Sequence, residues 1–403
     1  MAATAAGNAF GSGYSGVAPR ANIIAYKGCP DDSDGCSVSA LIRSIDQAVA
    51  DGVDVINYSI GGGLEDPWEY VGTAPYDDAE AFLAAREAGV VVSVAAGNDG
   101  PDPGTVTNPG NSPWTFGVAA ASHNRNGDNN ADLLAAFSVI KPDITGPGVS
   151  IISAGINGSQ SIAQLSGTSM ATPHIAGAAA LLKSTNPALT ADQIVSALHL
   201  TARPSVRRLP IGQPENPHNQ GSGMVDVAKA AQAGLYLEVP AGAFRNARAS
   251  VFTGGAENLN LPTMGHGGCF ISCQLTRSFK AMPGAAGTSY SVQASISAGA
   301  TITPSVGSFV SSAGGTAINF DISVQDSALV GSWAYGEVVL ATAVPTCACR
   351  WRSISRRCRT SRVRRRRSSS TPATNVASTM STCIRCCPCP TRASWGPTWS
   401  LPT

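Results

Sequence analysis

Three short stretches in the first hundred residues are apolar without polar alternation, at residues 22–27, 53–56 and 90–94. Such runs predict strands that are buried on both faces. Residues 38–51 and 76–88, which lie between these runs, carry apolar side chains at helical spacing. Strands that alternate with helices in this way predict a parallel sheet with helices on both faces. The fold class expected for this part of the chain is therefore α/β.

Two longer helices are predicted further along the chain. Residues 169–184 are rich in alanine, and residues 190–202 open with Thr190 and Gln193 at the spacing of a capping box. Residues 221–234 predict a strand entry followed by a closing helix. These elements extend the α/β pattern to about residue 236.

The pattern changes from about residue 237 onward. Residues 289–296 alternate between polar and apolar side chains, as do parts of 316–324 and 333–340, and glycine-rich turns separate these stretches. Several short alternating strands at such spacing predict an antiparallel β-sandwich.

Composition and charge divide the chain into three parts. Hydrophobic residues make up 43% of the 403 residues and charged residues 13%, which favours a compact globular protein over a disordered or nucleic-acid-binding chain. Residues 1–345 hold 15 Lys and Arg and all 26 acidic residues, whereas residues 346–403 hold 12 Arg and no acid. We expect an α/β domain over 1–236, a β-sandwich over 237–345 and a separate tail over 346–403.

The tail has three competing interpretations. The composition changes to Arg, Cys, Ser, Thr and Pro six residues after the strand-like Glu337–Leu340. The favoured interpretation is translation out of frame. Cys347–Ser353 can be encoded by codons that, read one base out of frame, give an apolar strand. A second interpretation is a basic arm around Arg364–Arg367 that binds nucleic acid or stays solvated. The third is a zinc knuckle. Its ligands would be Cys383, Cys386, Cys387 and Cys389. We expect the tail to be disordered.

The cysteines before the tail form two close pairs, Cys29 with Cys36 and Cys269 with Cys273. This spacing predicts two disulfides and an oxidising compartment. The loop Pro30–Gly35 inside the first pair holds three aspartates and is an alternative calcium site, although its spacing differs from that of an EF-hand.

The chain shows no membrane or export segment. No apolar run reaches the roughly 20 residues that a membrane span needs. The first eight residues lack the basic and apolar regions of a signal peptide. We therefore expect no membrane partner and no signal peptide within this sequence.

The strongest chemical signal is the run Gly167-Thr-Ser-Met-Ala-Thr-Pro-His174, in which Ser169 stands at the mouth of a predicted helix. A helix N-terminus presents free N–H groups and a partial positive charge, which stabilise the anions formed in acyl transfer. The same Gly-Thr-Ser could also be an ordinary helix cap.

Two glycine-rich loops follow predicted strands, at the sheet edge where parallel sheets gather their functional groups. Asn98 lies in the loop 95–100, where its amide can donate a hydrogen bond to an oxyanion, although Asn-Asp-Gly is also turn chemistry. The loop 57–63 suits either the binding of an extended peptide or a plain connection.

These motifs resemble those of the subtilase family of serine proteases, over roughly residues 5–236. Gly167–His174 is similar to the family's serine motif, Ala96–Asn98 to its oxyanion motif and Asn57–Gly62 to its substrate-binding strand. Two further landmarks follow the family's order, at Lys141–Gly148 and Gly221–Asp226. The part after residue 236 resembles the fibronectin-type-III-like domain of many subtilases.

The resemblance implies an endopeptidase that cuts peptide bonds through an acyl-enzyme on Ser169, with Asn98 and the Ser169 backbone N–H as its oxyanion hole. A substrate peptide would pair with Ser59, Ile60 and Gly61. The residue before the cut would lie against three further residues, Ala95, Ala96 and Gly97. The family also implies a secreted monomer that acts on proteins or peptides, needs no cofactor for its chemistry and in many members binds structural calcium.

The resemblance further implies a catalytic aspartate and histidine upstream of Asn98, and neither family motif occurs there. All five histidines of the sequence follow Asn98. Ala2–Asn8 resembles the stretch just after the family's histidine, so we expect an N-terminally truncated chain that is inactive as given. The alternative is a protein that holds peptide strands in the same cleft without cutting them.

Overall fold

The structure is a computed structural model of the chain. It describes residues 1–9, 13–30, 35–69, 71, 77–102, 104–123, 132–139, 142–158, 161–208, 213–240, 242–247, 255–326, 329 and 331–342. Residues 1–346 form one compact unit. The arginine and cysteine clusters predicted for the tail lie outside the described residues, as does most of the acidic loop 30–35.

A parallel sheet with the strand order β1-β2-β3-β4 forms the centre of the N-terminal part. Its strands are β1 (Val55–Tyr58), β2 (Val91–Ala95), β3 (Phe116–Ala121) and β4 (Ile144–Pro147). Val55 pairs with Val91 and Ser93 with Phe116, which sets the register of the first three strands. Every residue of β2 and β3 is buried, as their uninterrupted apolar sequences predict.

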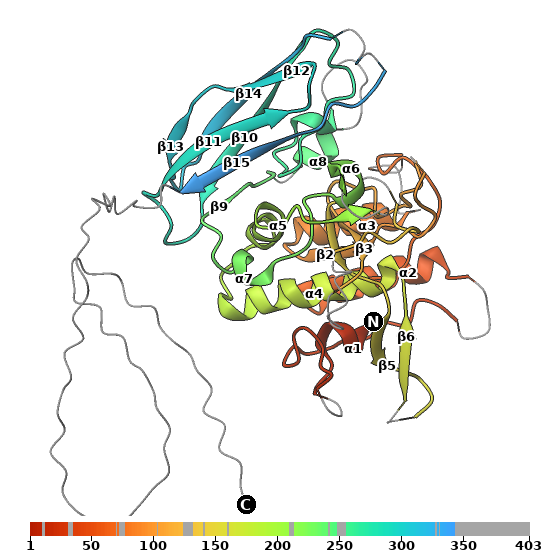
Figure 1. Cartoon of the computed structure of the whole chain (residues 1–403). Coiled ribbons are helices and arrows are strands. Elements are labelled where there is room, and N and C mark those ends of the chain that lie inside the picture. Colours follow the sequence, from red (N-terminus) through yellow and green to blue (C-terminus); the bar gives the residue numbers. More distant parts are fainter. Residues whose placement is uncertain are drawn as a thin grey trace, which may run out of the picture. The chain divides into compact units, whose positions relative to one another are not determined.

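Helices cover both faces of this sheet, as the sequence predicts (Figure 1). On one face, Val91 and Phe116 pack against α4 (Thr168–Thr185) and α5 (Ala191–Leu200). On the other, Val92 and Val94 pack with α2 (Val38–Ala50) and α3 (Asp78–Glu87). Alternate residues of one strand therefore face two separate cores.

The helix ends follow local sequence signals. Helix α3 is preceded by the N-cap Asp77, whose carboxylate accepts from the Ala79 N–H. The capping box predicted for α5 is present, with Thr190 and Gln193 bonding each other's backbone. The remaining short elements of this part are α1 (Ala2–Ala6), β5 (Ile151–Ala154), β6 (Ile162–Leu165), β7 (Arg207–Arg208), β8 (Gln213–Pro214), α6 (Pro217–Gln220), α7 (Val227–Ala230) and α8 (Ala243–Asn246).

The prediction of a buried strand over residues 22–27 is wrong. This segment has no regular structure, and Ile23 and Ile24 are 51% and 52% exposed. A strand needs a neighbour for its backbone N–H and C=O groups. In the four-stranded sheet β1 is an edge strand that pairs only with β2, so this segment does not join it.

Two antiparallel sheets follow in the C-terminal part and enclose a common core. One has the order β12-β14-β10-β9 and the other β13-β11-β15. Their strands are β9 (Leu235–Tyr236), β10 (Ser272–Ala281), β11 (Ser289–Ile296), β12 (Ala300–Pro304), β13 (Ser308–Val310), β14 (Thr316–Val324) and β15 (Gly336–Thr342), and a 3-10 turn spans Ala256–Asn258. Phe279 and Phe320 from the first sheet meet Tyr290 and Phe309 from the second. The predicted β-sandwich is therefore present.

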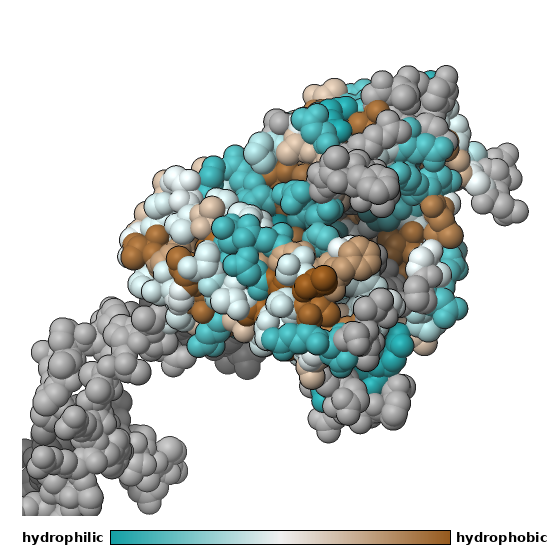
Figure 2. Space-filling view, turned by 90° about the horizontal axis from the view of Figure 1, so that it is seen from above, coloured by the Kyte–Doolittle hydropathy of each residue, from teal (hydrophilic) through white to brown (hydrophobic). Residues whose placement is uncertain are grey.

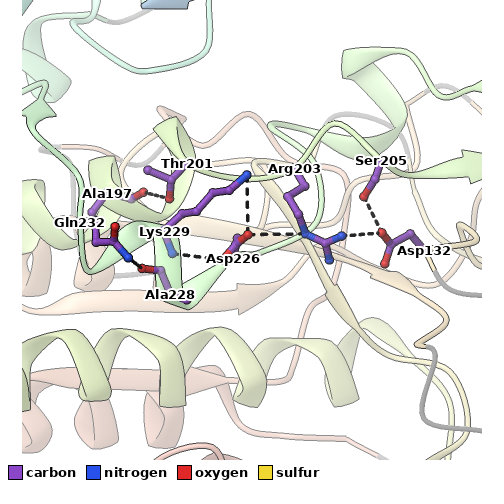
Figure 3. Close-up of polar contacts among 9 residues, drawn as sticks. All are labelled: Asp132, Ala197, Thr201, Arg203, Ser205, Asp226, Ala228, Lys229 and Gln232. Carbon is purple, nitrogen blue, oxygen red and sulfur yellow. Dashed lines mark hydrogen bonds and ion pairs between the residues drawn. The ribbon is translucent and has the colours of Figure 1, made fainter. Parts of the chain in front are cut away.

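Ionic contacts tie the end of the α/β part together. Arg203 lies between two carboxylates, 3.2 Å from Asp132 and 3.8 Å from Asp226 (Figure 3). Asp226 also caps α7 by accepting from the Lys229 N–H, and Ser205 donates to Asp132. Arg203 thus links the segment after β3 to the entry of α7.

The surface mixes polar and apolar residues. Figure 2 shows apolar side chains in small groups among polar ones on the face that it presents. No helix within the described ranges is both long and apolar enough to pass through a lipid bilayer.

Candidate active site

Ser169 lies in the first turn of α4, beside the segment that follows β1. Its hydroxyl donates to the Ser59 carbonyl at 3.2 Å, and the Ser59 hydroxyl donates back to the Ser169 carbonyl at 3.0 Å. This pair of bonds joins the predicted nucleophile to the predicted substrate-binding strand. Ser169 as a whole residue is half-buried.

The amide of Asn98 has a fixed orientation. Its Oδ1 accepts from the Thr168 N–H at 2.9 Å and lies 3.1 Å from the Thr168 hydroxyl. Because the oxygen is held, the Nδ2 donor points away from Thr168, and Asn98 itself is exposed. Within the described ranges, neither Asn98 Nδ2 nor the Ser169 N–H donates to a protein acceptor. Two N–H donors, that of Ser169 and that of the Asn98 side chain bonded to the neighbouring Thr168, are therefore available at the first turn of α4.

Thr168 is a site residue that the sequence reasoning did not assign. It is fully buried, and its hydroxyl lies 3.2 Å from the Gly97 carbonyl and 3.4 Å from the Gly97 N–H. Helix α4 is also held to β2 by the Ser93 hydroxyl, which donates to the Thr172 carbonyl. The threonine of the Gly-Thr-Ser run was the available signal, since a buried hydroxyl needs hydrogen-bond partners.

The other residues predicted to bind substrate lie on two neighbouring segments. Ser59 and Ile60 are half-buried and Gly61 is exposed, whereas Ala95 and Gly97 are buried. Ala96 is fully buried in a small apolar cluster with Val106 and Val139. Its side chain is turned away from solvent, and its backbone N–H and C=O are bonded to the Val118 carbonyl and the Thr107 N–H.

Residues 105–108 lie between these two segments. The Thr107 N–H donates to the Ala96 carbonyl, and the Gly62 N–H donates to the Asn108 carbonyl at 3.0 Å. A Cβ built on Gly61 would be 2.4 Å from Thr107 Oγ1, and one built on Gly97 would be 3.3 Å from the same atom. The sequence reasoning missed Thr107, because nothing in its local motif indicates that it contacts both glycines.

His174, His199 and His218 have hydrogen-bond partners other than Ser169. His174 Nδ1 bonds the Met170 carbonyl in its own helix, and burial lowers the pKa of His174. His199 is buried and bonds the Ser222 hydroxyl, with its pKa lowered to about 3 by burial. His218 bonds Tyr335. In the part of the chain that the structure describes, the Ser169 hydroxyl has no hydrogen bond to an imidazole.

Both cysteine pairs are disulfide-bonded in the structure, Cys29 with Cys36 and Cys269 with Cys273. The aspartates of the loop between Cys29 and Cys36 lie outside the described residues, so the alternative of a calcium site there stays a prediction.

Comparison with known proteins places these motifs in a family context. A family model described as the subtilase family matches residues 1–223. The chain is 34% identical over 213 residues to "Serine protease AprX" of Bacillus subtilis (strain 168), which covers 46% of this chain and 47% of that protein. It is 35% identical over 224 residues to "Subtilisin NAT" of Bacillus subtilis subsp. natto, which covers 55% and 51%. The solved structure "Sphericase" aligns with a TM-score of 0.47 at 29% identity, over 56% of this chain and 76% of that one. The chain spans about half the length of the curated relatives named here.

Proposed function

The chain belongs to the subtilase family, and we propose that it carries the nucleophile and the oxyanion hole of a serine endopeptidase, but not the general base. The supporting observation is the arrangement around Ser169. The Asn98 amide oxygen is held by Thr168, the neighbour of Ser169, which leaves Nδ2 free to donate, and the Ser169 hydroxyl bonds a carbonyl rather than an imidazole. Loss of one oxyanion donor typically costs 10²–10³ in rate, so the held Asn98 amide is a substantial part of the machinery.

The chemistry follows from these groups. In peptide hydrolysis, Ser169 Oγ would attack the carbonyl carbon of the substrate, and the Ser169 N–H with Asn98 Nδ2 would bind the resulting oxyanion. The hydroxyl proton must pass to a base, which an acid group orients, and later to the leaving amine. An extended peptide would lie along Ser59, Ile60 and Gly61 and pair with their backbone.

The base and its acid partner would have to come from residues that this sequence does not contain. As given, the chain is therefore expected to bind peptides and to cut them poorly. We further propose that its substrates are proteins or peptides and that it works as a secreted monomer. The two disulfides support an oxidising compartment. The C-terminal sandwich is proposed to be fibronectin-type-III-like, and structural calcium remains part of the proposal.

A fluorophosphonate probe tests this function, because it phosphonylates an activated serine and releases fluoride. The chain should label far more slowly than a complete subtilisin measured in parallel, while an acetylated peptide still binds. Ser169→Ala is the matched control, since it removes the reacting oxygen. Labelling of Ser169 at the rate of the complete enzyme would show that a base is present and would contradict the half-site proposal.

A further inference from the structure

The outer face of the C-terminal sheet carries a group of polar side chains that the proposed function does not use. They lie on β12, β14 and β10, which are neighbours in the strand order (Figure 1). Strand pairing sets six exposed residues in two rows across these strands, Thr301, Ser323 and Ser272 in one row and Thr303, Asp321 and Gln274 in the other. We call these six residues the polar grid.

The sandwich core fixes the direction of the grid. Leu275 and Phe320 are 3% and 0% exposed and pack in the core of the sandwich. Because successive side chains of a strand point to opposite faces, the neighbouring Gln274 and Asp321 point outward. The two rows are about 7 Å apart along the strands, and adjacent strands are about 4.8 Å apart. The backbone of a regular sheet therefore sets the spacing of these groups.

A hollow of about 350 Å³ lies over the grid, lined by all six residues together with Cys273 and Ile322. Small-molecule sites occupy roughly 300–1,000 Å³, so the hollow has the size of a ligand site. Gln274 Nε2 donates to Asp321 Oδ1 at 2.7 Å, which orients both side chains. The four hydroxyls make no hydrogen bond to another residue that the structure describes. They are free to donate to a ligand and to accept from it.

The chemistry of the grid narrows the class of ligand. Asp321 is its one charged member, and no basic residue belongs to it. Nucleic acids and other polyanions need cationic side chains, so they do not fit. Protein interfaces are enriched in aromatic residues, Met and Arg, and the grid holds none of these. Hydroxyl, amide and carboxylate groups in a dense array instead match a neutral ligand that carries many hydroxyls.

An exposed aromatic residue lies beside the grid in the sequence. Phe270 comes two residues before Ser272, within the loop that the Cys269–Cys273 disulfide closes, and it is 77% exposed. The C–H groups on the face of a sugar ring are apolar and pack against aromatic rings, while the hydroxyls at the ring's edge need hydrogen-bond partners. Phe270 supplies apolar aromatic surface, and the grid supplies the partners.

We propose that the polar grid and Phe270 form a binding site for a neutral carbohydrate chain. The hydroxyls of the sugar units would bond the two rows of the grid. The site uses no residue of the proposed active site, so this inference does not depend on protease activity. Such a site would hold the chain on material that carries neutral glycans.

A glycan microarray probed with the fluorescently labelled full chain tests the inference. The array should carry neutral polysaccharides, anionic polysaccharides and the oligosaccharides of glycoproteins. Neutral glycans should bind, and anionic ones should bind more weakly because of Asp321. Whether polysaccharide or glycoprotein spots respond shows the source of the ligand. The neutral oligosaccharide that binds best is then titrated by isothermal titration calorimetry.

Variants connect the binding to the grid. Thr303→Val keeps the size of the residue and removes its hydroxyl, Gln274→Ala removes the amide, and Phe270→Ala removes the ring. Each should weaken binding about 3- to 10-fold, as the loss of one such contact gives. Gln293→Ala is the matched control, because Gln293 is an exposed glutamine on β11 of the other sheet. It should bind as tightly as the unchanged chain.

Three results would overturn the proposal. The first is that no neutral glycan of the array binds. The second is that anionic glycans bind more tightly than neutral ones. The third is that Gln274→Ala and Thr303→Val bind the titrated oligosaccharide as tightly as Gln293→Ala does. Circular dichroism of each variant would show that a loss of binding is not a loss of folding.

Discussion

The close approach of Gly61 to Thr107 gives a prediction that needs no activity. In Gly61→Ala the new methyl would be 2.4 Å from Thr107 Oγ1, well inside van der Waals contact. The other neighbours of that position are Thr107 Cβ at 3.4 Å and the Asn108 carbonyl at 3.5 Å, which are ordinary contacts. The clash therefore comes from one atom, and removing that atom should relieve it.

The magnitude follows from two opposing effects. Overpacking typically costs about 1–3 kcal/mol. Replacing glycine by alanine at a backbone conformation that alanine tolerates returns about 0.4–1 kcal/mol by restricting the unfolded chain. We expect Gly61→Ala to lower the free energy of unfolding by about 1–2 kcal/mol. In a Thr107→Ala background the same change should be close to neutral, which makes the coupling energy about 1–2 kcal/mol.

Urea unfolding followed by tryptophan fluorescence measures these values, because Trp68 and Trp114 are buried and pack edge to face at 5.4 Å. Gly62→Ala is the matched control, since a Cβ there meets nothing within 4 Å. The reasoning is refuted if Gly61→Ala is as mild as Gly62→Ala, or if the loss persists in full when Thr107 is alanine.

Three further predictions concern buried charges and are read from urea midpoints. Burial raises the pKa of Asp143 from 3.8 to about 7, so the folded state binds the extra proton and stability should fall as pH rises from about 4 to 7. Asp143→Asn should flatten this slope, and an unchanged slope would contradict the assignment. Burial lowers the pKa of His199 from 6.5 to about 3, so its own contribution has the opposite sign, with stability lost as pH falls below 6.5, and His199→Gln should remove that loss. Arg277 is 2% exposed and donates to the carbonyls of Leu261 and Thr263. Arg277→Leu should cost about 3 kcal/mol because these acceptors would be left buried and unpaired, and a loss below about 1 kcal/mol would count against that role.

The periodicity of the sequence predicted an element well where the burial of its residues depends only on that element and its direct neighbours. The apolar run 90–94 became β2, the alternating segment 289–296 has the bounds of β11, and the partly alternating segment 316–324 lies in β14. An apolar run alone did not ensure burial at residues 22–27, since Ile23 and Ile24 are exposed. Such a run does not show whether a neighbouring strand is there to pair with it.

In the candidate site too, features marked by a local motif could be predicted from the sequence, and contacts between distant segments could not. Ser169 and Asn98 were predicted as site residues because local motifs mark them. That Thr168 holds the Asn98 amide, and that Thr107 lies between two glycines, depends on segments far apart in the sequence. Gly61 and Thr107 are 46 positions apart, and only the folded chain shows how closely they approach.

The bond from the Ser169 hydroxyl to the Ser59 carbonyl also determines where the hydroxyl proton rests in the empty cleft. A carbonyl oxygen holds that proton but cannot carry it away, so the serine is idle until the bond is broken. Breaking it costs about 1 kcal/mol, or roughly a fivefold penalty on the population ready to react. Any partner that activates this serine must first outcompete the Ser59 carbonyl oxygen, which belongs to the segment proposed to bind peptides.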